Sequence, residues 1–207
     1  MSESAKPEAA GFIAATAMFV EVLVVGIGSL AAVFGCAAAV VGSQNIEKAA
    51  PVLNSTPVSG VALAFAYALG IVVDRGADHV LRSSRRNLRS LHFASTSSFD
   101  QARRAVAENS HIMAMSDYAR SRMRICRGWL ANSIFLTIAA DLVILRFPVS
   151  GRAPIFVFCT LMGLLLALGF YAAWRNITAT GYKKLAQQAG VGATVLPNQA
   201  SSVPPGA

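Results

Sequence analysis

Four arginines lie within eight consecutive positions of the sequence. Guanidinium groups are permanently charged and bind phosphate or carboxylate oxygens in pairs, so such a row could hold an acidic partner or anionic lipid headgroups. In a helix the arginines share one face, beside an apolar face. The same row could equally be a solvated face or a signal of membrane sidedness. The arginines are Arg82, Arg85, Arg86 and Arg89, and the apolar face carries Leu81, Ser84, Leu88 and Leu91.

A second basic group follows further along the chain. In a helix, Arg120, Arg124 and Arg127 line one face, with Asp117 beside them. Basic side chains next to an apolar segment attract anionic lipid, at about 1 kcal/mol each near the surface, and we expect Arg124 and Arg127 to do so. Aromatic residues that could stack on bases are few in this region, which argues against nucleic acid as a partner. They are Phe93, Phe99 and Tyr118.

Asp141 is the most costly residue of the apolar segments. It lies about 18 Å along a helix axis from Trp129, which places it within the hydrocarbon layer of a membrane. A carboxylate at that depth costs about 2.5–3.5 kcal/mol and normally faces a bundle interior or a water-filled cavity. Asp141 is therefore a candidate pore residue. The alternatives are a satisfied hydrogen bond between helices, or an approach to the nearby Arg146.

Glu21 is the second acidic residue near an apolar segment. Counted back from Gly42, it lies about 32 Å away along a helix, near the inner boundary of a membrane. We interpret it as a structural anchor that pairs with Arg127 or Arg175, although it is also a candidate intramembrane polar site.

The sequence contains no recognisable catalytic motif. It has no G-x-S-x-G, no H-E-x-x-H and no glycine loop for phosphate, and His79, His92 and His111 lack metal-ligand spacing. We therefore expect no catalytic residues, no cofactor and no metal site. A membrane enzyme is the third functional hypothesis.

The composition indicates what must position these residues. Of the 207 residues, 55% are hydrophobic and 14% are charged, against about 25% charged in soluble domains. Four apolar segments are long enough to cross a hydrocarbon core of about 30 Å. The sequence therefore predicts an all-α integral membrane protein with four transmembrane helices.

The basic residues predict the orientation. The net charge is +8, and 11 of the 18 Lys and Arg residues lie between Arg75 and Arg127, where there are only four acids. Cytoplasmic loops carry an excess of Lys and Arg, so this region and the basic tail both belong inside. We expect both termini in the cytoplasm, a location in the inner cell membrane, and contact with its anionic inner leaflet.

The region between the second and third spans is expected to form a basic helical hairpin that extends both spans into the cytoplasm. Residues Ala105, Ile112, Ala119 and Met123 follow steps of seven and four, as a packed helical pair requires. Ser98 with Gln101 resembles a capping box. The predicted order is an N-terminal segment (1–10), a first helix (11–42) with its span at 22–42, a second span (57–74), the hairpin (75–127), a third span (128–147), a fourth span (154–174) and a tail (175–207) disordered from about 189.

Small residues recur every fourth position in the first span. Such pairs let helix backbones approach closely, either within one bundle or between subunits. With the apolar composition, they suggest a homo-oligomer or a membrane partner. The residues are Gly28, Ala31, Ala32, Gly35 and Ala39.

Two non-enzymatic functions remain from the sequence. The first is an oligomeric ion-conducting pore or membrane-disrupting effector, with Asp141 facing the interior. The alternative is a membrane scaffold or accessory subunit whose basic hairpin docks a soluble cytoplasmic protein.

Overall fold

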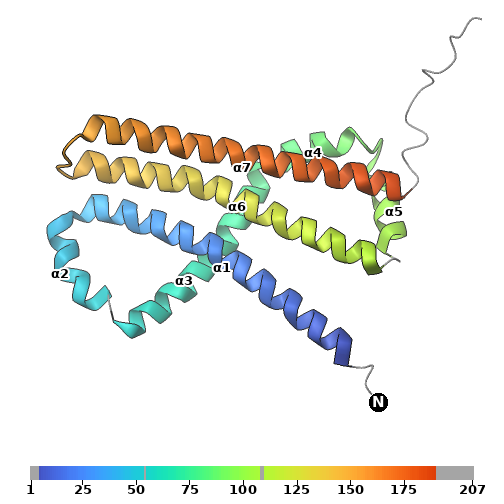
Figure 1. Ribbon diagram of the computed structural model, residues 1–207, viewed down its shortest axis with the longest axis horizontal. Coiled ribbons are helices and arrows are strands. Elements are labelled where there is room, and N and C mark those ends of the chain that lie inside the picture. Colours follow the sequence, from blue (N-terminus) through green and yellow to red (C-terminus); the bar gives the residue numbers. More distant parts are fainter. Residues whose placement is uncertain (1–4, 54, 108–109, 190–207) are drawn as a thin grey trace, which may run out of the picture. The chain divides into compact units, whose positions relative to one another are not determined.

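The computed structural model describes the backbone of residues 5–53, 55–107 and 110–189, and their side chains except at 5–14, 43 and 110–117. Over these residues the protein forms seven α-helices and no strand, which confirms the all-α prediction (Figure 1). The tail beyond 189, expected to be disordered, lies outside the described residues. The helices are α1 (Ala5–Val41), α2 (Ser43–Leu53), α3 (Thr56–Val80), α4 (Arg82–Ser90), α5 (Thr96–Ala107), α6 (Ser110–Arg146) and α7 (Arg152–Gln188).

Four helices of the described chain are long and apolar enough to cross a membrane, as predicted. The candidate spans extend beyond the predicted boundaries, most clearly in α7, which continues as helix to Gln188 through the start of the expected tail. The connection between the first two spans is itself a helix, α2. Gly42 ends α1 with a φ of +86°, a conformation that glycine adopts without strain. The four spans are Ala15–Val41, Thr56–Val80, Tyr118–Arg146 and Arg152–Gln188.

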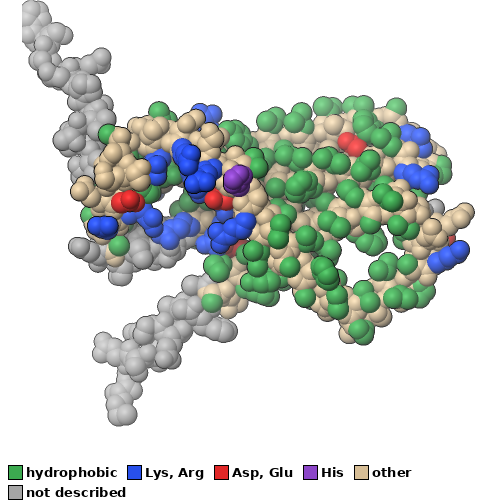
Figure 2. Space-filling model, turned by 180° about the vertical axis from the view of Figure 1, so that it is seen from behind, with side chains coloured by type: hydrophobic (Ala, Val, Ile, Leu, Met, Phe, Trp, Pro, Cys, Tyr) green, Lys and Arg blue, Asp and Glu red, His purple; other side chains and the backbone are tan. Residues whose placement is uncertain are grey.

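The chain divides into two compact units. The first, here called the apolar unit, comprises residues 1–80 and 121–174, and its eight Lys and Arg nearly balance its seven acids. The second, the basic unit, comprises residues 81–120 and 175–207, with ten Lys and Arg but only three acids. Figure 2 shows hydrophobic side chains over the helices of the apolar unit and a concentration of Lys and Arg side chains on the basic unit.

Two close helix contacts organise the apolar unit. α1 crosses α3 where Gly26 meets the backbone of Ala66, so closely that a Cβ at Gly26 would overlap the Ala66 carbonyl oxygen (Figure 1). Within this unit α6 and α7 run side by side after the short 147–151 connection, with the rings of Trp129 and Phe170 stacked at 6.1 Å. Most of the surface of each span is left uncovered.

The outer surface of the apolar unit is hydrophobic. On α7, Leu161, Leu165 and Leu168 are each about 60% exposed, and on α3 Phe65 is 62% exposed. Such a contiguous apolar surface is unfavourable in water but suits hydrocarbon chains. Lipid is therefore the medium that this surface fits.

The first arm of the hairpin expected for 75–127 is interrupted. α3 ends at Val80 and the chain turns at Leu81 before α4. The junction between α5 (to Ala107) and α6 (from Ser110) lies outside the described residues. Leu81 and Leu88 are buried as expected, but Leu91 follows the end of α4 and is 72% exposed. The apolar row ends there because the helix does.

α5 begins three residues earlier than the sequence suggested. The backbone N–H of Ser98 donates to Ser95 Oγ at 3.1 Å, and the Ser95 N–H donates back to Ser98 Oγ at 3.3 Å. This reciprocal cap replaces the one expected between Ser98 and Gln101. The buried face of α5 accordingly carries Ala102 and Val106, whereas Ala105, placed in the predicted seam, is exposed.

Candidate functional site

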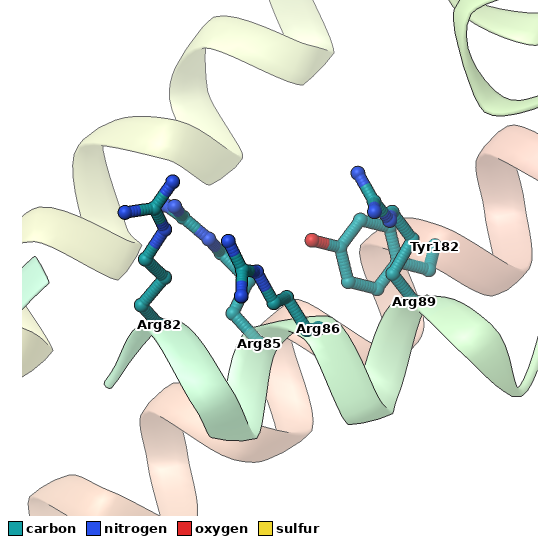
Figure 3. A pocket seen from close by; sticks show the side chains of 5 residues that line it. All are labelled: Arg82, Arg85, Arg86, Arg89 and Tyr182. Atoms are coloured by element: carbon teal, nitrogen blue, oxygen red, sulfur yellow. The ribbon is translucent and has the colours of Figure 1, made fainter. Parts of the chain in front are cut away.

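The basic unit contains a cavity of about 200 Å³ whose lining is almost entirely cationic. The four arginines of α4 rise from one face of that helix, and Tyr182 reaches the same cavity from the end of α7 (Figure 3). Leu81 and Leu88 are buried on the adjoining face. The buried leucines hold α4 so that its guanidinium groups converge on the cavity. The lining residues are Arg82, Arg85, Arg86, Arg89 and Tyr182.

The spacing of these arginines concentrates positive charge. Each has another three or four positions away on the helix, where like charges repel by about 0.2–0.5 kcal/mol per pair. Arg82 and Arg86 are exposed, whereas Arg85 and Arg89 are half-buried. No carboxylate is among the residues that the structure describes around the cavity. An anion in the cavity would relieve the repulsion between these like charges, although Arg85 and Tyr182 also have interactions of their own.

Tyr182 belongs to an aromatic cluster that sequence reasoning missed. Phe93 is 3% exposed and contacts the rings of Phe99 and Tyr182 edge-on, at 5.2 and 6.5 Å between centroids. Ala102 and Ala186 complete this core. The sequence gives only a weak indication of this cluster, because Tyr182 falls in the predicted tail, far along the chain from Phe93 and Phe99. Since Phe93 is buried against these neighbours, it is not available to stack on a nucleic-acid base.

The aromatic cluster also fixes one of the arginines. The Arg89 guanidinium lies over the Phe99 ring, 5.4 Å from its centroid, and donates to Thr96 Oγ1 at 3.4 Å. Arg103 approaches the same ring at 5.9 Å. Contacts of this kind stabilise a cation by about 0.5–1 kcal/mol at exposed sites. Arg89 is therefore held at the wall of the cavity.

The second basic group does not join this cavity. Arg127 lies in the apolar unit, where Nε and Nη2 donate to Asp74 Oδ1 at 3.1 and 2.6 Å and Nη1 donates to Asp78. Its side chain is only 12% exposed, so it acts in an internal ion pair. Arg124 lines a cavity of about 10 Å³, and Arg120 is exposed in the basic unit. The three arginines that were expected to form one row on a helix face therefore lie in three different environments.

Glu21 is a structural contact, but its partner differs from both predicted arginines. Ser121 Oγ donates to Glu21 Oε1. Arg127 is engaged by Asp74 and Asp78 instead. The small cavity beside Glu21 is at the lower limit of the space that one water molecule needs.

Only one of the two carboxylate oxygens of Asp141 has a hydrogen-bond partner among the described residues. Thr160 Oγ1, on α7, lies 3.0 Å from Asp141 Oδ2 and 2.9 Å from the Phe156 carbonyl oxygen, so its one proton is shared between the interhelical hydrogen bond considered from the sequence and a bond within α7. Asp141 Oδ1 and Glu21 Oε2 are the buried side-chain oxygens without a partner in the described part of the chain. The apolar unit therefore contains two acidic groups with unused hydrogen-bonding capacity.

Asn132 is a buried polar residue that the sequence analysis did not single out. It is completely buried, its Nδ2 donates to the Val25 carbonyl at 2.7 Å, and its Oδ1 accepts from Ser29 Oγ at 2.7 Å. Both partners lie on α1, so Asn132 ties α6 to α1. The sequence did contain an indication of this role, because an uncharged amide side chain inside a predicted span needs a hydrogen-bond partner.

The small residues of the first span mostly serve contacts within the chain. Gly28 leaves room for the Asn132 amide, and a Cβ at Gly35 would lie 3.1 Å from Ala139 Cβ. Ala32 and Ala39 are buried, whereas Ala31 is exposed. Gly28 and Gly35 of the predicted packing face thus contact α6 within the same chain.

The described residues contain no group of three His, Cys, Asp or Glu side chains arranged to hold a metal ion. Comparison of the chain with models of protein families, with curated proteins and with solved structures finds no match. The functional argument therefore rests on the residues of the two units themselves.

Proposed function

We propose that this chain is a non-enzymatic, multi-pass protein of the inner cell membrane, acting as a scaffold or accessory subunit. Its basic unit is the docking part, and the partner is a soluble cytoplasmic protein with an acidic surface. The observation that carries this proposal is the cavity lined by four arginines. An accumulation of positive charge steers and selects acidic partners.

The distribution of charge supports this reading and the orientation. The basic unit has a net charge of +7, whereas the apolar unit has +1. The positive-inside rule then places 81–120 and the residues after 174 in the cytoplasm, with four spans and both termini inside. In this topology the basic unit is the helical hairpin between the second and third spans, completed by the end of α7.

The proposed orientation can be tested by cysteine labelling in intact vesicles. In a chain whose own three cysteines are replaced, a cysteine at Arg86 should react with a charged thiol reagent only from the cytoplasmic side. A cysteine at Val149, in the 147–151 connection, should react only from the other side. Labelling of both from one side would contradict the four-span topology.

The docking proposal predicts capture of an acidic polypeptide. The full chain in nanodiscs of zwitterionic lipid should bind polyglutamate, and replacing the four cavity arginines with glutamate should abolish binding. A control with the same change of charge, at basic residues outside the cavity, should retain most of it. Equal loss in both would leave net charge as the cause. The control residues are Arg103, Arg104, Lys183 and Lys184.

A pore is the second candidate, and Asp141 Oδ1 is the observation that favours it. A buried carboxylate oxygen without a partner in the described chain suits an ion path completed by further copies of the protein. Purified protein in liposomes should then pass cations, and Asp141→Asn should change the flux. No flux, or flux that this substitution leaves unchanged, would contradict the pore.

A further inference from the structure

We infer that α2 is an interfacial helix, which lies in the headgroup layer of the membrane and turns an apolar face toward the lipid chains. α2 (Ser43–Leu53) joins the first two spans. α1 ends at Val41 and α3 begins at Thr56, so both ends of α2 are held at the same boundary of the membrane, on whichever side that is. The inference goes beyond the docking proposal, because it requires only that α1 and α3 cross the membrane.

The side chains of α2 divide into an apolar face and a polar face. At 100° per residue, apolar residues recur at steps of three, one and three, and the polar residues lie on the opposite side of the helix. The polar face carries one acid and one base, so apolar contact rather than attraction to anionic lipid must hold the helix at the membrane. The apolar face consists of Ile46, Ala49, Ala50 and Leu53, with Val52 beside it, and the polar face carries Gln44, Glu47 and Lys48.

The protein covers the apolar face of α2 only in part. Ile46 and Ala50 are half-buried, whereas Ala49 is exposed. The side chains of Leu53 and Val52 are 39% and 64% exposed. α2 lies where α1 and α3 have diverged from their crossing, so neither helix encloses it (Figure 1). With a span at each end, these exposed apolar side chains lie at the depth where the lipid chains begin, and lipid is the partner that they fit.

The backbone around α2 is also adapted to this depth. Asn45 Nδ2 donates to the Val41 carbonyl at 3.1 Å, at the end of α1, and Ser55 Oγ donates at 2.7 Å to a carbonyl in the last turn of α2. Carbonyl groups without a donor are costly beside hydrocarbon, which offers none. Within α2, Pro51 has no N–H for the Glu47 carbonyl, and both residues lie on the polar face. That face therefore suits water and headgroups, which supply donors.

The test places a spin label on each face of α2 in the full chain, in liposomes of zwitterionic lipid. The chain's own three cysteines are replaced by serine, and a single cysteine is introduced at Leu53 or at Glu47. Collision rates are measured with oxygen, which concentrates in lipid, and with a water-soluble nickel chelate. The ratio of the two rates should be roughly tenfold higher at Leu53 than at Glu47, because a helix is about 10 Å across. Leu165, exposed on α7, is the lipid reference, and Val149 is the water reference.

A pair of matched variants tests whether the apolar face holds the helix. With the label at Ala49, Val52→Asn together with Leu53→Asn should lower the ratio of oxygen to nickel collisions to that of the water reference. Gln44→Asn together with Lys48→Asn, the same substitution on the polar face, should leave the ratio unchanged. Equal effects of the two pairs would contradict a role for the apolar face.

The labels at Leu53 and Glu47 separate the alternatives. A water-like ratio at both would overturn the inference by placing α2 outside the membrane, and a lipid-like ratio at both would overturn it by placing α2 within the hydrocarbon. Low collision rates with both reagents at Leu53 would overturn it in favour of a covering protein, either a second copy or a partner. None of these results involves the arginines of α4, so the inference and the docking proposal can fail independently.

Discussion

The apolar unit and the basic unit place their arginines in different surroundings. In the apolar unit, Arg127 is paired with Asp74 and Asp78, although Asp141 and Glu21 each keep one buried carboxylate oxygen without a partner among the described residues. In the basic unit, four arginines converge on a cavity whose described lining includes no carboxylate. Charges that are matched inside a fold maintain that fold, whereas like charges gathered at a cavity are a cost that a ligand can relieve.

This difference separates two meanings of a basic residue in a membrane protein. Arg127 and Arg86 are both arginines near an apolar helix, and a count of charge treats them alike. Their neighbours show that removing Arg127 should damage the fold, whereas removing Arg86 should damage binding. Substitutions ordered by their effect on stability can therefore test the comparison.

Arg127→Leu should produce the largest loss. It leaves the Asp74 carboxylate, which is only 15% exposed, without its counter-ion, and breaking such a pair costs about 3–5 kcal/mol. Denaturant unfolding in detergent micelles would measure the loss. The control is Arg75→Leu, because Arg75 is exposed and adjacent in sequence to Asp74. Adding Asp74→Asn to Arg127→Leu should recover part of the stability, and no recovery would contradict the ion-pair explanation.

Gly26→Ala should cost about 2–3 kcal/mol, because the new Cβ would overlap the Ala66 carbonyl oxygen and force α1 away from α3. Gly60→Ala is the matched control on α3, since a Cβ there meets nothing within 4 Å. Thermal unfolding of the two variants side by side would make the comparison. Similar stability in both would show that the crossing of α1 and α3 is not as close as described.

Asn132→Ala should cost about 1–3 kcal/mol by removing two buried hydrogen bonds between α6 and α1, each worth about 0.5–1.5 kcal/mol, although Ser29 Oγ can still donate to the Val25 carbonyl 3.1 Å away. Ser133→Ala, one residue away, removes a hydrogen bond only to the Trp129 carbonyl of the same helix and should cost much less. Urea unfolding of both variants would separate a tie between helices from a local one. Equal losses would contradict a special role for Asn132.

The features that depend on hydrophobic periodicity and composition could be predicted from the sequence. The contacts between residues far apart in the sequence could not. The helical class and four apolar helices followed from hydrophobic runs that only a membrane accommodates. The row of α4 arginines followed from helical spacing. Tyr182 did not, because a residue nearly a hundred positions from Arg85 reaches the cavity only through the fold. The partner of Glu21 was wrong for the same reason, since charge alone favoured arginine over Ser121.

The break between α3 and α4 illustrates a second limit. Residues 75–94 contain no proline, and uninterrupted helix was the expectation. The chain nevertheless turns at Leu81, whose side chain is buried. Tertiary packing can override local propensity when it buries an apolar side chain. Neither the turn nor the cavity that it positions could be derived from the period alone.

Arg86→Gln should produce the smallest effect on stability, and one of opposite sign. The substitution removes the repulsion between Arg86 and its like-charged neighbours Arg82 and Arg89. The free energy that stabilises α4 should therefore rise by about 0.2–0.5 kcal/mol, which corresponds to roughly a twofold increase in the protection of its amides from exchange. Hydrogen exchange at low ionic strength would measure this gain, and raising the salt to about 1 M should remove it through screening. Lys184→Gln, at an exposed position of the same unit, is the control. Reduced protection in Arg86→Gln would mean that Arg86 stabilises α4, as Arg127 stabilises the apolar unit, and the contrast between the two units would fail at its most sensitive point.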